Sequence, residues 1–339
     1  MRTRESVDQV PDPWQAKEAL ERALFEIRKV IAGQDVMLER VLVCLLTGGH
    51  LLIEGVPGLA KTLTVKTAAA VLGGSFKRVQ FTPDLVPSDL VGTRIFRPDR
   101  SEFETELGPV FCNFLLADEI NRAPAKVQSA LLEVMQEHQV TIGHETHYVP
   151  DPFLVMATQN PIESEGTYPL PEAQVDRFML KILVDYPHHD EELTVVHRSL
   201  AVAPELPQVL SIDELRGLQQ TVDHIYVDPA LVTYAVQLAA ATRRTADVGV
   251  PELAAYISFG ASPRGPISLI RAARALAVLR GRDYVLPQDV DELAKDALRH
   301  RLVLSYEALA EERTPDLLLD ELIAAVTAPP IDLSKPTAA

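Results

Sequence analysis

The sequence predicts an α/β domain followed by a helical domain. Short apolar segments alternate with helix-like segments from residue 50 to residue 184, and the strand signal disappears after about residue 188. Strands that alternate with helices indicate a parallel sheet covered on both faces. The length of 339 residues also exceeds that of one average domain. The expected division is a polar leader, an α/β core, an all-helical domain and a tail, at residues 1–14, 15–187, 188–330 and 331–339.

The α/β region begins with two helices. Apolar residues recur at helical spacing from Gln15 to Ile31, Gly33 breaks the pattern, and a second helix is expected from Gln34 to Leu46. Two further helices are expected between strands, at residues 61–72 and 124–137. The strands expected to form the sheet are short and mostly apolar, and they cover residues 50–54, 76–81, 113–119, 152–158 and 178–184.

Two segments interrupt this alternation. Residues 82–110, rich in Pro and Gly, lie between two strands where a simple crossover helix would suffice. Residues 139–150 alternate apolar and polar side chains around Gly143, a pattern typical of a hairpin. Insertions on an otherwise regular fold usually make specific contacts.

Helix-capping signals dominate the second half of the chain. Ser211-x-x-Glu214 is a capping box. Three other sites place a cap residue before a proline that starts a helix. These sites are Asp228-Pro229, Ser262-Pro263 and Thr314-Pro315. They favour an all-helical domain whose boundary with the core falls near Pro187.

Composition restricts the class of function. Lys and Arg number 32 against 48 Asp and Glu, and the net charge of −16 disfavours binding to nucleic acid or anionic membranes. The first residues lack the apolar segment of a signal peptide, and no apolar run reaches the ~18 residues of a membrane span. Cys44 and Cys112 lie in apolar runs, so we interpret both as core residues rather than zinc ligands or a disulfide. We therefore expect a cytoplasmic protein.

A glycine-rich turn between a strand and a helix predicts a phosphate-binding loop. Backbone N–H groups of such a loop surround phosphates, and the helix N-terminus favours negative charge. Lys61 would reach the β- and γ-phosphates of ATP, and the hydroxyl of Thr62 would bind Mg²⁺. Ala60 departs from the strict pattern, which has glycine there. The residues of this Walker A segment are Gly55, Val56, Pro57, Gly58, Leu59, Ala60, Lys61 and Thr62.

Two carboxylates end the strand that begins near Phe114. Asp118 is expected to hold Mg²⁺ together with Thr62, and Glu119 to polarise the attacking water. Adjacent acids at a strand end are common, so this Walker B interpretation depends on the preceding Walker A segment. The pair predicts ATP hydrolysis with Mg²⁺.

Three polar residues are candidates for sensing the γ-phosphate. Asn160 ends a strand and could orient the water, or simply form a turn before Pro161. Arg177 could act on ATP bound by a neighbouring subunit, as an arginine finger does. Its alternative is an ion pair with Asp176 or Glu172. Arg264 begins a helix, where the macrodipole disfavours a cation, and this suggests a role in closing the helical domain over the phosphates.

The chain resembles the MoxR family of AAA+ ATPases over roughly residues 15–330. The similar phrases are GGHLLIEGVPGLAKT, FTPDLVPSDLVGT, LADEINRAP, MQEHQVTIG, ATQNPIESEGTYPLPEAQVDRF and GASPRG. The resemblance implies a P-loop AAA+ core with a five-stranded parallel sheet of order 5-1-4-3-2, a helical lid and a hexameric ring. It implies that residues 82–110 contain the helix-2 insert and that residues 139–150 form the pre-sensor 1 hairpin, both facing the pore.

The resemblance also implies further contacts and partners. Ile31, Gly33 and Gln34 would line the adenine pocket, and Ala60 is usual in the family. Its members mature or activate other proteins, often with a partner that contains a von Willebrand factor A domain. We therefore expect a protein client and such a partner.

Four functional hypotheses stay open at this level. The first is an ATP-driven remodelling chaperone. A nucleic-acid motor is a second, but residues 139–150 carry His144 and His147 and no Lys or Arg, and only Arg94, Arg97 and Arg100 of the insert support it. A third is a scaffold that binds ATP with little turnover. The fourth, a motor subunit of a metal chelatase, differs from the first only in its partner.

Overall fold

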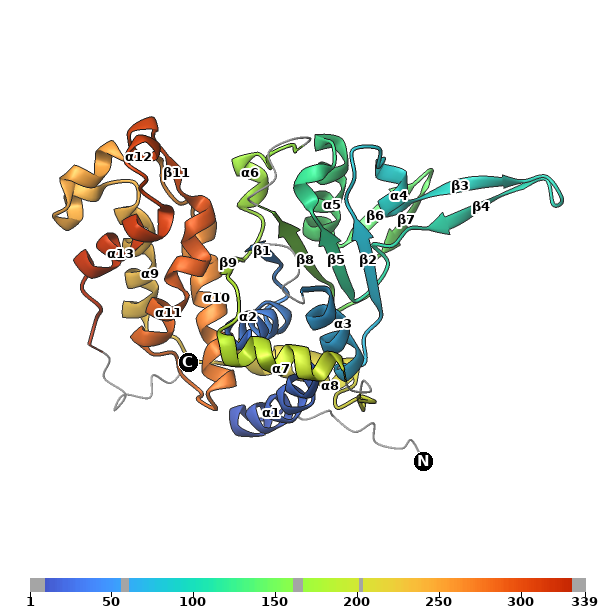
Figure 1. Cartoon of the computed structure of the whole chain (residues 1–339), viewed down its shortest axis with the longest axis horizontal. Helices are drawn as coiled ribbons and strands as arrows, with labels where there is room; N and C mark the ends of the chain where they lie inside the picture. Colours follow the sequence, from blue (N-terminus) through green and yellow to red (C-terminus); the bar gives the residue numbers. More distant parts are fainter. Residues whose placement is uncertain (1–9, 56–60, 161–166, 201–203, 331–339) are drawn as a thin grey trace, which may run out of the picture.

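The structure is a computed structural model that describes residues 10–55, 61–160, 167–200 and 204–330. Figure 1 shows an α/β core and a helical unit side by side, with one long hairpin projecting from the core. Helices α1 (Pro13–Val30) and α2 (Asp35–Leu46) of the core contact α10 (Arg264–Leu279) of the helical unit, and α11 (Pro287–Leu298) contacts strand β9 (Leu180–Val184). The two units therefore share a packed boundary.

The core is built on a five-stranded parallel sheet. Its order is β2-β5-β8-β1-β9, which is the predicted 5-1-4-3-2 when the sheet strands are counted along the chain. This prediction is confirmed. The strands are β1 (Leu51–Gly55), β2 (Phe76–Gln80), β5 (Phe114–Asp118), β8 (Leu154–Gln159) and β9 (Leu180–Val184).

Alternate side chains of these strands enter two different apolar clusters. Leu51 and Ile53 belong to one cluster, whereas Leu52 belongs to the other. The period of two follows from strand geometry and gives a sheet buried on both faces. The first cluster includes the core helices α1 (Pro13–Val30), α2 (Asp35–Leu46) and α3 (Lys61–Val71), and the second includes α5 (Ala125–Glu137).

Both interrupting segments contain antiparallel hairpins. After the short helix α4 (Pro87–Val91), strands β3 (Gly92–Arg97) and β4 (Glu102–Leu107) pair and extend away from the core (Figure 1). Strands β6 (Gln139–Ile142) and β7 (Glu145–Tyr148) form the second hairpin, with Gly143 at a φ of 67° in the turn. The alternating pattern of residues 139–150 predicted this hairpin correctly.

The C-terminal unit is mostly helical, with one small sheet that the prediction missed. Strands β10 (Ile257–Phe259) and β11 (Val303–Leu304) pair antiparallel, so the expectation of an all-helical domain is corrected in this detail. Segments of two and three residues are too short to show a strand period. Helix α6 (Glu172–Val175) precedes β9 in the core, and the helices after β9 are α7 (His189–Ser199), α8 (Ile212–Asp223), α9 (Pro229–Ala241), α10 (Arg264–Leu279), α11 (Pro287–Leu298), α12 (Tyr306–Ala310) and α13 (Pro315–Ala325). Short 3-10 turns are η1 (Ile120–Arg122), η2 (Thr245–Val248), η3 (Pro251–Ala255) and η4 (Arg299–Arg301).

The predicted helix caps are present with one exception, at α10. Ser211 and Glu214 form the capping box, and Asp228 and Thr314 cap α9 and α13. Helix α10 instead begins after Pro263, with the Ser262 hydroxyl accepting from the Arg264 backbone.

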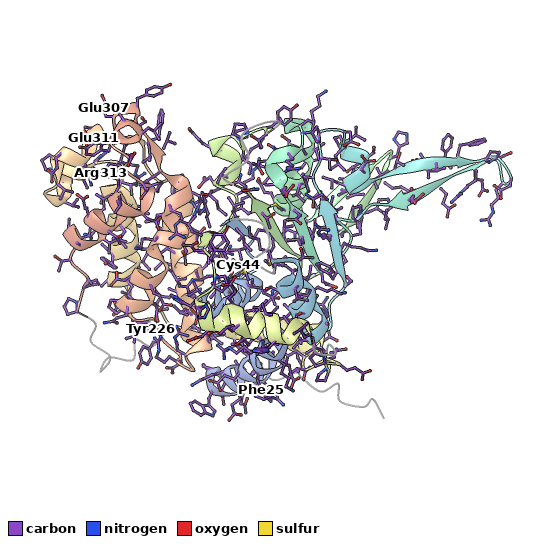
Figure 2. All side chains as sticks on the ribbon, in the orientation of Figure 1. Phe25, Cys44, Tyr226, Glu307, Glu311 and Arg313 are labelled. Carbon is purple, nitrogen blue, oxygen red and sulfur yellow. The ribbon has the colours of Figure 1, made fainter. Side chains whose placement is uncertain are left out.

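The interior holds both cysteines. Cys44, labelled in Figure 2, and Cys112 are fully buried, and burial raises the pKa of each thiol, that of Cys112 to about 12. Among the described residues, none of the helices has the length and apolar character that crossing a bilayer requires.

Candidate nucleotide-binding site

The predicted phosphate and metal ligands follow strands that end at one edge of the sheet. Strands β5, β8 and β1 are adjacent and parallel, so their carboxyl ends lie together. Asp118 ends β5, Asn160 follows β8, and Gly55 ends β1. Ligands of open parallel sheets bind at this edge. The loop residues Val56, Pro57, Gly58, Leu59 and Ala60 lie outside the described residues.

Lys61 is a buried cation at the start of α3. Its Nζ donates to the Gly55 carbonyl at 2.6 Å. Burial lowers the pKa of Lys61, and the nearby carboxylates of Asp118, Glu54 and Glu119 act in the opposite direction. A desolvated ammonium group is therefore held at the base of the predicted loop, where an incoming phosphate would meet it. Thr62 follows it in the first helical turn.

Asp118 is held by hydrogen bonds from two sides. The hydroxyl of Thr158 donates to its Oδ1 at 2.6 Å. On the other side, Nη2 and Nε of Arg78 donate to its Oδ2 at 2.6 and 3.1 Å. Both contacts fix the orientation of this carboxylate, an oxygen ligand of the kind that Mg²⁺ prefers.

Glu119 is fixed through its backbone and its side chain. Its φ of 55° lies in the left-handed region, which a non-glycine residue rarely adopts and which is frequent at functional sites. The backbone N–H donates to Thr158 Oγ1 at 2.8 Å, so one hydroxyl orders both acids. Gln80 donates to Glu119 Oε2 at 2.8 Å, and Arg122 forms an ion pair with the same oxygen at 2.9 Å.

The predicted adenine-pocket residues lie between α1 and α2. Ile31 is buried, and Gly33 and Gln34 both have positive φ angles, of 67° and 59°. A side chain at Gly33 would meet the carboxylate of Glu191 at 2.7 Å. Helix α7 therefore packs closely over this turn. Asn160 is buried and makes polar contact within the protein.

Arg177 lies at the opposite edge of the sheet from Lys61. It precedes β9, whose first residue Leu180 is paired with Leu51 at the start of β1, whereas Gly55 ends that strand. Four residue steps separate the two ends, about 13 Å at the rise of a parallel strand. The structure therefore separates Arg177 from the predicted phosphate and metal ligands of its own chain.

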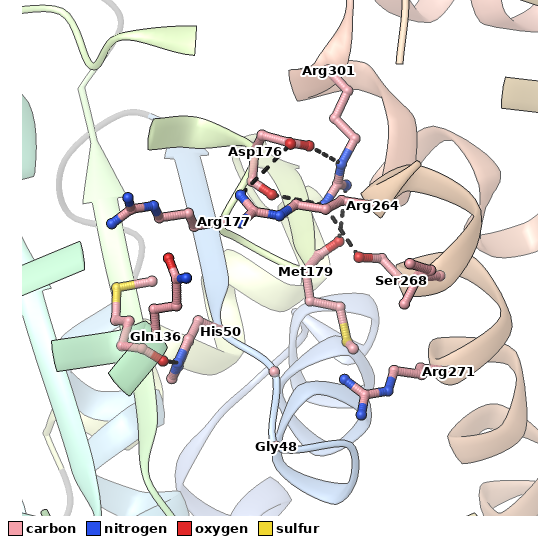
Figure 3. Close-up of a pocket in the computed structure, with 13 residues that line it drawn as sticks. Gly48, His50, Gln136, Asp176, Arg177, Met179, Arg264, Ser268, Arg271 and Arg301 are labelled. Carbon is pink, nitrogen blue, oxygen red and sulfur yellow. Dashed lines mark hydrogen bonds and ion pairs between the residues drawn. The ribbon is translucent and has the colours of Figure 1, made fainter. Parts of the chain in front are cut away.

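Arg177 and Arg264 instead line a common cavity between the core and the helical unit. Its volume is about 290 Å³, and Figure 3 shows Arg177 pointing away from Asp176. Nε of Arg177 is buried and has no hydrogen-bond partner among the described residues. Neither Asp176 nor Glu172 pairs with it in the described part of the chain, so the simple ion-pair interpretation does not hold. Besides these two, the lining arginines are Arg271 and Arg301.

Arg264 lies 3.8 Å from Asp176, measured from Nη1 to Oδ2. The expectation that Arg264 closes over the phosphates of its own subunit does not fit this position, because the depth of the sheet separates it from Lys61. The packing of α10 against the core decides the direction in which this arginine points.

Comparison with known proteins assigns the chain to a family. Residues 50–180 match the ATPase family associated with various cellular activities (AAA), and residues 252–322 match the AAA lid domain. The chain is 56% identical over 313 residues to Chaperone MoxR1 of Mycobacterium tuberculosis, a match that covers 92% of this chain and 83% of the relative. It is a member of the MoxR family of AAA+ ATPases.

One further relative and one solved structure match nearly the whole chain. Protein YeaC of Bacillus subtilis is 43% identical, with 91% of this chain and 95% of that protein covered. The crystal structure of a candidate ATPase from Cytophaga hutchinsonii superposes with a TM-score of 0.89 at 46% identity, over 94% of this chain and 97% of that one. The AAA+ core and lid are therefore shared across the compared chains.

The residues of the MoxR site fit ATP with Mg²⁺. A hydroxyl at Thr62 and a carboxylate at Asp118 are hard oxygen ligands of the kind that Mg²⁺ prefers, and the buried cation Lys61 suits a phosphate. In the described residues, no three His, Cys, Asp or Glu side chains form a metal cluster by themselves. Mg²⁺ that binds with a nucleotide takes several ligands from phosphate and water.

The sequence analysis missed four residues that contact the two acids of the candidate site: Arg122, in the turn after Glu119, and three residues of neighbouring strands. Thr158, Arg78 and Gln80 contact the acids but belong to neighbouring strands. A polar Thr158 within an otherwise apolar strand was the one available signal. The other two face the acids only because Gln80 is paired with Asp118 across the sheet.

Proposed function

We propose that this chain hydrolyses ATP with Mg²⁺ at sites shared between neighbouring subunits of a ring. The proposal rests on the positions of the candidate residues, which lie at two opposite edges of one sheet: the edge where its strands end and the edge where they begin. Lys61, Asp118 and Glu119 lie at the edge where strands end, and Arg177 at the edge where β9 begins. A head-to-tail contact between copies would bring one edge against the other, and such contacts close into rings.

The first edge supplies binding and water activation. In the proposal, the backbone from Gly55 to Ala60 and the ammonium of Lys61 bind the phosphates, and Thr62 and Asp118 hold Mg²⁺. The metal neutralises charge on the transferred phosphoryl group. Glu119 accepts a hydrogen bond from the attacking water, and Asn160 orients that water. The ordered backbone of Glu119 supports this role, because phosphoryl transfer depends chiefly on positioning and charge stabilisation.

The second edge supplies positive charge to the neighbour. Arg177 and Arg264 would face the γ-phosphate bound by the adjacent subunit, Arg177 as an arginine finger. Two observations support this role: the common cavity, and the buried Nε of Arg177, which has no hydrogen-bond partner within the described part of the chain. In this form of the proposal, Arg264 acts between subunits instead of over its own nucleotide. The expected assembly is a hexamer, as the family resemblance implies.

The proposed outcome of hydrolysis is remodelling of a client protein. A relative bears the name of a chaperone, and the projecting β3–β4 hairpin exposes Phe96 and Phe103, whose rings lie 5.2 Å apart. Exposed aromatic side chains are suited to transient contact with unfolded segments. A protein with a von Willebrand factor A domain is the proposed partner, and the cytoplasm the proposed location.

A mixing experiment tests the shared site. Glu119→Gln should bind a fluorescent ATP analogue without turnover, whereas Lys61→Ala should lose binding. Arg177→Ala should bind ATP normally and also fail to hydrolyse it. Mixed rings of Glu119→Gln and Arg177→Ala should regain activity, because some interfaces combine an intact Glu119 with an intact Arg177. No recovery in rings shown to contain both variants would refute the shared site.

A further inference from the structure

The segment that carries Arg177 makes hydrogen bonds with the helical unit. Arg177 has a buried Nε without a partner in the described residues, so its direction depends on the backbone around it. Its two neighbours in the chain, Asp176 and Phe178, both bind residues of the helical unit. The backbone of Arg177 also donates to the Gln174 carbonyl within the core, so the position of the arginine depends on the core and the helical unit together.

Arg301 makes most of these contacts. Its Nε donates to Asp176 Oδ1 at 2.7 Å, and its Nη2 donates to the Phe178 carbonyl at 2.8 Å. The side chain of Arg301 is only 1% exposed. A buried cation of this kind needs a charged partner and several acceptors, and breaking such a pair leaves an uncompensated charge.

The two other residues of turn η4 bind the same core segment. Nε2 of His300 lies 3.0 Å from the Phe178 carbonyl, and Arg299 donates to the Lys181 carbonyl at 2.8 Å. Arg299 is itself paired with Asp296 and Asp316 at 2.7 and 2.8 Å. The side chains of Arg299, His300 and Arg301 therefore bind the start of β9, and the residues just before it, to the lid.

Asp176 also links the second arginine of the cavity. Its Oδ2 accepts from the Ser262 hydroxyl at 2.8 Å, and the same hydroxyl accepts from the Arg264 backbone at 3.1 Å. One carboxylate thus connects the segment of Arg177 with the first turn of α10 (Figure 3). A shift of the lid would move both arginines together.

We propose that Asp176 and Arg301 are positioning residues that hold Arg177 in the orientation needed to act on the nucleotide of the adjacent subunit. The inference rests on the proposed function, in which Arg177 acts between subunits. Its consequence is that the lid of one subunit controls hydrolysis in the next. A displacement of about 1 Å in a catalytic group can cost about 10²-fold in rate, so a small shift of this pair would suffice.

Conservative variants test the inference. Arg301→Lys keeps the charge and loses the forked contact, whereas Asp176→Asn keeps the shape and loses the charge. Both should bind the fluorescent ATP analogue with native affinity and lose ATPase activity by about 10²-fold, since only positioning is disturbed. Arg282→Lys is the matched control, because Arg282 forms a comparable pair with Asp289, at 2.6 Å, entirely within the lid. It should retain activity at a similar change in melting temperature.

The decisive measurement is which pairs of variants recover ATPase activity when they are mixed in one ring. Mixed with Glu119→Gln, Arg301→Lys should recover about a quarter of native activity, since about one interface in four joins two intact halves in a random ring. Mixed with Arg177→Ala, it should recover nothing, because both variants damage the same half. The pair Glu119→Gln with Arg177→Ala serves as the reference.

Each failure has a distinct meaning. If the reference pair does not recover, the shared site itself is wrong. If the reference pair recovers ATPase activity but Arg301→Lys mixed with Glu119→Gln does not, the loss of activity reflects a general structural defect. The positioning role is then overturned. Native activity of both variants, or recovery of Arg301→Lys with Arg177→Ala, would overturn it as well. Should Arg301→Lys fail to fold, Asp176→Asn is judged by the same mixtures.

Discussion

The guanidinium group of Arg78 lies against the carboxylate of Asp118, with Nη2 donating to Oδ2 at 2.6 Å. Asp118 is the residue proposed to hold Mg²⁺, so a side-chain cation and the metal would share one carboxylate. Arg78 is anchored on the edge strand β2 and also donates to Gln80 at 2.8 Å. Metal binding would therefore proceed in competition with an internal ion pair.

Replacing Arg78 by alanine should lower the Mg²⁺ concentration needed for half-maximal ATPase activity. The side chain is 45% exposed, and exposed pairs contribute about 0.2–1 kcal/mol, which corresponds to a change of at most about five-fold. Titration of Mg²⁺ at fixed ATP measures it. Arg97→Ala, which removes an exposed pair with Glu104 on the projecting hairpin, is the control. A higher Mg²⁺ requirement in Arg78→Ala would show that the arginine assists the metal.

Thr158→Val should impair catalysis more than ATP binding. The hydroxyl donates to Asp118 and accepts from the Glu119 backbone, and valine has a similar shape without either bond. Leaving buried polar groups unpaired costs about 1–3 kcal/mol, so the melting temperature and kcat should both fall. Thr158→Ser keeps the hydroxyl and is expected to restore kcat. Equal loss in both variants would show that the two hydrogen bonds of the hydroxyl do not account for the effect.

The sequence was sufficient to predict the residues that stand at strand ends. Lys61, Asp118 and Asn160 follow apolar strands, and strands of a parallel sheet end at a common edge, so their association needs no knowledge of the packing. Thr158, Arg78 and Gln80 were missed because their contacts depend on the register between neighbouring strands. A one-residue shift would turn each side chain to the other face.

The packing of the helical unit against the core could not be predicted from the sequence either. Asp176 and Arg301 are 125 positions apart, and no local pattern links them. The orientation of Arg264 likewise depends on how α10 rests against the core. The nature of the helical unit followed from its caps, whereas its short β10–β11 pair did not, because so few residues carry no period.

Acid should destabilise the protein partly through His50. This side chain is buried, its Nδ1 accepts from the Val155 backbone at 3.1 Å, and its Nε2 donates to the Met135 carbonyl. Burial lowers the pKa of His50 from its ordinary value of 6.5 to about 4. The unfolded chain therefore takes up a proton before the folded one, and the free energy of unfolding should fall as the pH drops from about 6.5 to about 4. The loss is of order 3 kcal/mol.

Denaturant unfolding at several pH values measures this contribution. His50→Asn should reduce the slope between pH 6.5 and pH 4 without removing it, because burial also lowers the pKa of His300. His224→Gln, which removes a histidine from an exposed position, is the control variant. An identical slope in His50→Asn would show that this group does not contribute.

Gly33→Ala should weaken ATP binding through helix α7. The residue has a φ of 67°, and an added Cβ would lie 2.7 Å from the Glu191 carboxylate. That carboxylate accepts a hydrogen bond from the His188 backbone at the start of α7, at 3.1 Å, so moving it aside should break this capping contact and loosen α7 beside the proposed adenine pocket. Gly249→Ala is the matched control, since it has a φ of 84° and nothing within 4 Å of an added Cβ. Both variants pay the left-handed backbone cost of about 1–2 kcal/mol, but only Gly33→Ala should raise the Kd for ATP. Equal ATP affinity in the two variants at matched loss of stability would exclude contact between this turn and the nucleotide.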